Sequence, residues 1–177
     1  MTMPGPLTRA LALAGLLFSA FAAAGPAMAA PADIALLKSY IGEWRGRGIM
    51  IGATQEPVTC RLSLTQGNQD KVNYNGHCTL AGNNLSVAGT MAYIDANKRY
   101  EAVMTSNATF TGVAIGQKRG QNLIFNLRER EKDEAGKDLN ITAQIQLSKA
   151  AIEVAFEVIY VESGDNLRAE VPFSRQD

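Results

Sequence analysis

Residues 139–160 read LNITAQIQLSKAAIEVAFEVIY, and this stretch decides the fold. From Leu139 to Leu147 apolar and polar residues alternate strictly, and from Ile152 to Tyr160 a second set of apolar residues recurs at every other position. A period of two is typical of a strand with one dry and one wet face. Only three or four residues separate the two runs, which predicts an antiparallel hairpin.

The same rhythm extends in both directions along the chain. Ten short runs follow one another at intervals of 11 to 16 residues, beginning near Trp44, Pro57, Lys71, Leu85, Lys98, Thr109, Asn122, Asp138, Ala151 and Asn166. No helix-sized insert separates them, so parallel βαβ units are excluded. Ten hairpin-linked strands leave two costly open edges unless the sheet closes. We therefore predict an all-β fold, a ten-stranded antiparallel up-and-down β-barrel. A short helix over residues 31–40 is expected to precede it, in which Asp33 caps the first turn and Ile34, Leu37 and Ile41 share a face.

The N-terminus has the three parts of a secretory signal peptide. A short segment with one positive charge, Arg9, precedes the apolar residues 10–24, and Ala27-Met28-Ala29 supplies small residues for cleavage after Ala29. The apolar run is shorter than the ~20 residues that span a bilayer. We expect residues 1–29 to be a signal peptide, residues 30–177 to form one barrel domain without a transmembrane anchor, and the protein to be periplasmic or secreted.

The balanced charge of the chain argues against nucleic-acid and anionic-membrane partners. The 17 basic and 17 acidic residues balance, and loss of Arg9 leaves a net charge of about −1. Nucleic acid and anionic membranes both attract clustered positive charge, and the sequence has no such cluster. The mixed run 128–134 is interpreted as a solvated strand end and loop. We expect no nucleic-acid partner.

The two cysteines, Cys60 and Cys78, are predicted to form a disulfide. A hairpin turn centred on residues 68–70 places Leu64 opposite Tyr74, and the same register places Cys60 opposite Cys78 on the apolar face. Directly opposed residues on neighbouring strands come close enough to bridge. An oxidising compartment favours the bond.

The segment 40–48, YIGEWRGRG, resembles the opening of the lipocalins and related calycin barrels. The longer Gly-x-Trp-x-Gly-x-Gly pattern, Gly42, Trp44, Gly46 and Gly48, is similar to that of the nitrobindin-type ten-stranded barrels. The resemblance implies a barrel closed at one end by Gly42 and Trp44, with a small-molecule cavity inside. Nitrobindins bind haem through a histidine near the C-terminus, which this chain lacks, so we expect neither haem nor any other cofactor.

Catalytic and metal constellations are missing from the sequence. His77 is the one histidine, so multi-histidine metal sites are excluded, and its place in the polar phase of its strand predicts an outward direction. No Gly-x-Ser-x-Gly elbow occurs, and the predicted disulfide leaves no thiol nucleophile. We expect no enzyme and no metal site, although an isomerase or cyclase using Tyr, Asn or Glu remains a third hypothesis.

The first functional hypothesis is a non-enzymatic binding barrel for a small hydrophobic ligand. Inward glycines such as Gly89, Gly112 and Gly116 are expected to leave room inside a ten-stranded barrel. The residues expected to line this cavity are apolar, with a few phenol hydroxyls: Tyr74, Met91, Tyr93, Tyr100, Met104, Phe110, Phe125 and Phe156. The same residues could instead pack the barrel solid, and the alternative is then an envelope interaction protein that works through its outer surface.

Overall fold

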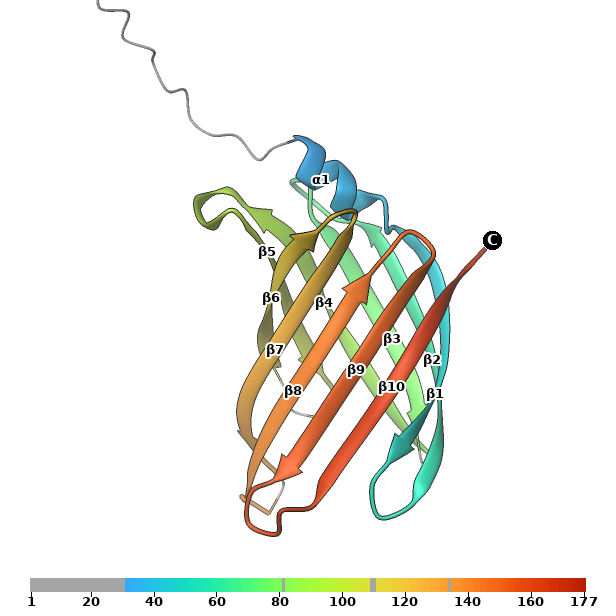
Figure 1. Ribbon diagram of the computed structural model, residues 1–177, viewed down its shortest axis with the longest axis vertical. Helices are drawn as coiled ribbons and strands as arrows, with labels where there is room; N and C mark the ends of the chain where they lie inside the picture. The colour runs from blue at the N-terminus through green and yellow to red at the C-terminus, as the bar shows by residue number, and fades with distance from the viewer. Residues whose placement is uncertain (1–30, 81, 109–110, 134) are drawn as a thin grey trace, which may run out of the picture.

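The chain folds into a closed barrel of ten antiparallel strands (Figure 1). A computed structural model describes residues 31–80, 82–108, 111–133 and 135–177. Each strand pairs with its neighbours in the chain, and β1 pairs with β10 to close the sheet. The strands are β1 (Gly42–Ile51), β2 (Gln55–Gln66), β3 (Val72–Leu80), β4 (Asn83–Ile94), β5 (Arg99–Ser106), β6 (Thr111–Arg119), β7 (Asn122–Lys132), β8 (Asp138–Leu147), β9 (Ala151–Tyr160) and β10 (Asn166–Gln176).

This architecture confirms the predicted fold class, strand number and topology. Every strand begins within two residues of its predicted start. Closure also removes the two sheet edges, which is the physical reason for preferring a barrel. The predicted signal peptide lies outside the described residues, and none of the helices within them is long and apolar enough to cross a membrane.

One helix, α1 (Pro31–Lys38), lies across one end of the barrel (Figure 1). Leu37 is fully buried beneath it, while Ile34 and Ile41 on the predicted apolar face are partly buried. The prediction that Asp33 caps the helix is wrong, because the helix begins at Pro31 and Asp33 lies within its first turn. The Asp33 carboxylate instead accepts hydrogen bonds from the barrel, as described below.

The β2–β3 hairpin has the predicted register. Leu64 pairs with Tyr74, Cys60 pairs with Cys78, and the two cysteines form a disulfide with their Cα atoms 4.0 Å apart. Gln69 and Asp70 in the turn adopt positive φ angles of 52° and 63°. The register that joins the apolar faces therefore also joins the cysteines.

Aromatic rings of neighbouring strands cover three inward glycines. Gly89 pairs with Tyr74, Gly116 with Phe125, and Gly46 with Phe173. A Cβ atom on Gly116 would lie 2.5 Å from the Phe125 ring, and one on Gly89 would lie 2.5 Å from the Tyr74 hydroxyl oxygen. The expectation that Gly89 and Gly116 leave empty space is wrong, because these rings occupy it.

Candidate ligand-binding cavity

Along the barrel axis, the inward-facing side chains change from buried to partly exposed to solvent. On β3, β5, β8 and β9 the inward residue nearest α1 is buried: Val72, Tyr100, Leu147 and Ile152. Farther from α1, the inward residues Tyr74, Met104, Ile145 and Val154 are only partly buried. Apolar side chains that point into a barrel yet keep exposed surface must face a hollow, and the gradient places the opening at the end away from α1.

The hollow is a cavity of about 300 Å³. Its lining consists of aliphatic, aromatic and sulfur-containing side chains, together with the hydroxyl group of Ser106. Arg61 also borders it, but Arg61 pairs with His77 in the outward phase of the hairpin and is exposed. This volume is at the lower end of the range of small-molecule sites, and mostly apolar walls are typical of them.

Five of the eight predicted lining residues border the cavity, namely Tyr74, Met91, Met104, Phe125 and Phe156. Tyr93 and Tyr100 do not: their rings meet edge to face with centroids 5.0 Å apart, and Tyr100 is buried beneath α1. Phe110 lies outside the described residues.

Most of the wall consists of aliphatic residues that the prediction did not name. These come from the same alternating pattern on six strands: Leu62, Leu80, Leu85, Val87, Ile141, Ile145, Val154, Val158 and Val171. The signal was present, because each is in the inward phase of its strand. The prediction favoured large aromatic residues and so missed them.

The Tyr74 hydroxyl is already engaged within the protein. It donates a hydrogen bond to the Val103 carbonyl oxygen at 2.9 Å, across the space over Gly89. Burial raises the pKa of this phenol well above its ordinary value. Tyr74 therefore presents its ring rather than a free hydroxyl to the cavity.

The disulfide is part of the cavity wall. Cys60 and Cys78 both border the hollow, and Cys78 keeps some exposed surface while Cys60 is 2% exposed. Both cysteines are thus oxidised and turned inward. They add polarizable apolar surface rather than reactive thiols.

Trp44 closes the barrel beneath α1. Its side chain is 1% exposed, and its indole N–H donates to the Tyr40 carbonyl oxygen at 3.1 Å. The Arg175 guanidinium lies 4.5 Å from the centre of the Trp44 ring and donates to the carbonyl oxygens of Ser39 and Ile41. A side chain on Gly42, whose φ is +149°, would collide with that guanidinium. Gly42 and Trp44 thus lie at the closed end.

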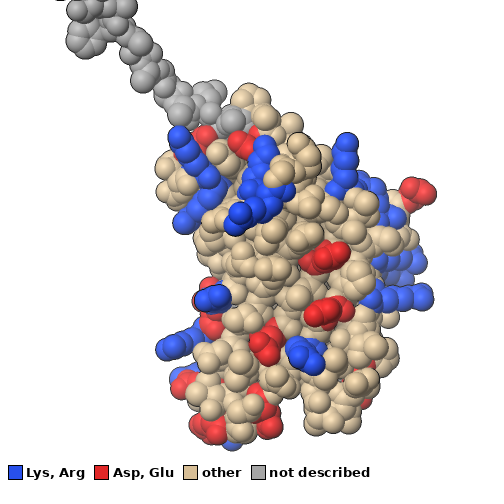
Figure 2. All heavy atoms as spheres, viewed as in Figure 1, with Lys and Arg blue, Asp and Glu red and all other residues tan. Residues whose placement is uncertain are grey.

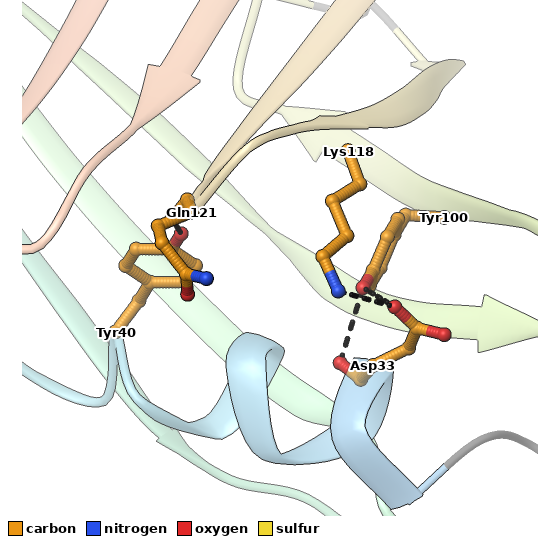
Figure 3. Close-up of polar contacts among 5 residues, drawn as sticks. All are labelled: Asp33, Tyr40, Tyr100, Lys118 and Gln121. Carbon is orange, nitrogen blue, oxygen red and sulfur yellow. Dashed lines mark hydrogen bonds and ion pairs between the residues drawn. The ribbon is translucent and has the colours of Figure 1, made fainter.

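A second polar cluster fastens α1 to the sheet (Figure 3). The Tyr100 hydroxyl lies 3.0 Å from the Asp33 carboxylate, and the Lys118 ammonium lies 3.2 Å from the same oxygen. Tyr40 donates from its hydroxyl to the Gln121 carbonyl oxygen at 2.9 Å. Burial, with the Asp33 carboxylate, raises the pKa of Tyr100, and burial raises that of Tyr40. These contacts make a sealed floor beneath the cavity.

His77 lies on the outer face, as its strand phase predicts. Its ring nitrogen Nδ1 is 3.0 Å from the Ser86 hydroxyl oxygen, and its side chain is exposed. Within the described ranges, no group of three His, Cys, Asp or Glu residues could hold a metal ion. We therefore find no place for His77 in the interior site.

A larger hollow crosses the outside of the barrel over β7, β8, β9, β10 and β1. It measures about 1080 Å³ and mixes Arg47, Arg128 and Arg168 with Glu157 and Glu170. Figure 2 shows this side of the barrel, with acidic and basic side chains scattered over uncharged surface. The groove is open to solvent and carries five charged side chains, so water competes for the polar contacts there. The enclosed interior is the better site for a small molecule.

Comparison with known proteins supports the fold. No family model and no curated protein matches the chain. Among solved structures, Rv2717c from M. tuberculosis matches with a TM-score of 0.66 at 14% identity, over 84% of this chain and 99% of that one. The S-type phycobiliprotein lyase CPES from Guillardia theta matches with a TM-score of 0.52 at 10% identity, over 81% and 91%.

The fold and the cavity define the class of protein. The chain is a closed ten-stranded antiparallel barrel with an apolar interior cavity, and these two solved structures resemble it in fold. Likeness at this level of identity describes architecture. Function must be argued from the cavity itself.

Proposed function

We propose that this protein binds a small hydrophobic molecule inside its barrel and does so without catalysis. The observation that carries the proposal is the apolar interior hollow, in which side chains such as Ile145 and Val154 remain partly exposed. Transfer of apolar surface from water stabilises a complex by roughly 25 cal/mol per Å². A ligand that fills the hollow removes this wall from water together with its own surface.

The chemistry of the wall supports a binding role. Apart from Ser106, Tyr74 and the outward Arg61, the wall consists of hydrocarbon, thioether and disulfide groups, which supply neither a general base nor a nucleophile. The nearest phenol, that of Tyr74, donates to a backbone carbonyl oxygen and has a raised pKa. The wall can therefore hold a ligand by burial but has little with which to transform it.

We further propose that the protein works outside the cytoplasm. The tripartite segment 1–29 supports export, and the Cys60–Cys78 disulfide suits an oxidising compartment. The pattern Gly42, Trp44, Gly46 and Gly48 supports a kinship with nitrobindin-type barrels in architecture. The proposed ligand differs from haem, because the wall offers no histidine.

Binding can be tested with the neutral fluorescent probe N-phenyl-1-naphthylamine. The wild-type protein should enhance and blue-shift the probe's emission. Ala143 points into the cavity, whereas its neighbour Gln144 is exposed on the outer face. Ala143→Trp should weaken binding about tenfold or more by filling the hollow, and Gln144→Trp should bind as the wild type does.

Circular dichroism and melting temperature of both variants establish that they are folded. If Gln144→Trp and Ala143→Trp bind the probe equally well, the probe sits outside the barrel. If the wild type fails to bind it at all, the proposal is wrong.

A further inference from the structure

We propose that the ligand is a cationic amphiphile with a single tail, which enters tail first and leaves its ammonium group at the mouth of the barrel. The inference rests on the proposed function and adds the chemical class and the orientation of the ligand. The inference follows from the distribution of charged residues along the inner face of the barrel.

Within the described residues, the interior offers no inward charged partner for a head group. Among the described residues that line the cavity, the only charged one is Arg61, which is turned outward and exposed. A polar group buried without a hydrogen bond costs several kcal/mol, and a buried unpaired charge costs more. An amphiphile therefore keeps its head in water, and water reaches the hollow from the end away from α1.

Three glutamates occupy inward positions at that end. Glu129 of β7 pairs directly with Ile141, which lines the cavity, and Glu131 pairs with Leu139 one step nearer the rim. On β2, Glu56 pairs with the buried Met50. All three are partly buried. The β7–β8 register is unbroken from Leu123 to Lys132, so Glu129 continues the inner row that contains Phe125 and Leu127.

The described inward positions of the mouth half include no lysine or arginine. The inward cations lie at the closed end instead, where Lys118 pairs with Asp33 and Arg175 donates to backbone carbonyl oxygens. On the outer lip, Lys132 is held by Asp138 at 2.7 Å and Lys137 by Glu162 at 3.5 Å.

A ligand seated tail first brings its head group beside these carboxylates. An ammonium is attracted and a carboxylate is repelled, by an amount that water and salt reduce. Burial of the tail contributes most of the binding free energy, and the charge of the head group determines which ligands bind more tightly. Glu129 is the main specificity residue, because it lies one inward position from Leu127 of the cavity wall.

The test compares decylamine, decanol and decanoate, which share one tail, as competitors of N-phenyl-1-naphthylamine at neutral pH and low salt. We expect decylamine to bind about fivefold more tightly than decanol, a factor typical of a partly screened ion pair, and decanoate to bind more weakly than decanol. Added salt should reduce the differences in affinity among the three competitors. In the double variant Glu129→Gln, Glu131→Gln, the preference for the amine should fall below about twofold.

Glu153→Gln on the exposed outer face of β9 is the matched control and should keep the preference. Equal affinity for all three competitors would overturn the ligand class while leaving hydrophobic binding in place, as would a preference unchanged in the double variant. Failure of every competitor and of the probe would instead overturn the proposed function.

Discussion

At the scale of single residues, three glycines decide how closely the barrel wall packs. Gly46, Gly89 and Gly116 each lie under an aromatic ring from the neighbouring strand. Gly89 is the most constrained, because a Cβ atom there would lie 1.9 Å from the Val103 carbonyl oxygen as well as against Tyr74. The ring covers the bare backbone, so these glycines serve packing rather than cavity volume.

Gly89→Ala should therefore lower the free energy of unfolding by about 1–3 kcal/mol, the usual cost of overpacking. Urea denaturation measures this effect. Ala88→Val, one residue earlier on the exposed outer face, should be nearly neutral. A Gly89→Ala protein as stable as the wild type would show that the backbone at β4 and β5 is looser than described.

Tyr74 and Tyr100 should make the fold sensitive to alkali. Burial raises the pKa of both phenols in the folded state, and for Tyr100 the Asp33 carboxylate adds to the shift. A raised pKa favours the neutral phenol in the fold, so the stabilisation is complete below the unfolded pKa of about 10 and is lost as pH rises above it. Tyrosinate absorbance from these two residues should appear together with loss of circular dichroism.

The variant Tyr74→Phe, Tyr100→Phe provides the control, since it should lose the part of the absorbance change above pH 10 that these two phenols contribute. Ionisation of all five tyrosines near pH 10 with the fold intact would contradict the raised pKa of these two phenols.

Sequence reasoning placed residues on the correct face but did not place them along the barrel axis. Tyr100 and Phe125 are both inward, yet one lies beneath α1 and the other borders the hollow. Alternation specifies the side of a strand, whereas depth depends on the stagger between strands, which arises only on closure. Glu129 was missed for a different reason: its charged run was interpreted as a solvated strand end and loop, although the period of two places Glu129 on the inner face.

At the scale of elements, hairpin registers were the most predictable feature. The β2–β3 register followed from one requirement, that apolar faces meet, and it placed Cys60 against Cys78. The contacts of α1 were not predictable, because Asp33 and Lys118 are 85 residues apart in the chain and meet only when β6 reaches the closed end. Local pattern fixes neighbouring strands, whereas closure fixes distant contacts.

Removal of the disulfide by Cys60→Ser, Cys78→Ser should lower the free energy of unfolding by about 2–4 kcal/mol, chiefly through a less constrained unfolded chain. The bond links residues 18 apart. Chemical denaturation in oxidising buffer measures the loss, and reduced wild-type protein should unfold at nearly the midpoint of the variant. An unchanged midpoint in the variant would mean that the bridge contributes nothing to stability.

At the scale of the whole molecule, the barrel has two unlike ends. Trp44, Arg175 and the Asp33–Tyr100–Lys118 cluster seal one end beneath α1. At the other end the inner face is apolar up to a rim of glutamates. The barrel is closed at the end beneath α1 and open at the other end, so a ligand can enter from one end only. The glutamates at the open end favour a bound ligand whose positive charge lies at the mouth.

The central claim is that the barrel encloses an apolar hollow, and xenon binding in a crystal tests it most directly. Apolar cavities that stay dry bind xenon. The protein under xenon pressure should show xenon inside the barrel, in contact with Phe156, Ile145 or Val154 of the wall. An interior that holds only ordered water, or side chains packed without any space for xenon, would contradict the account.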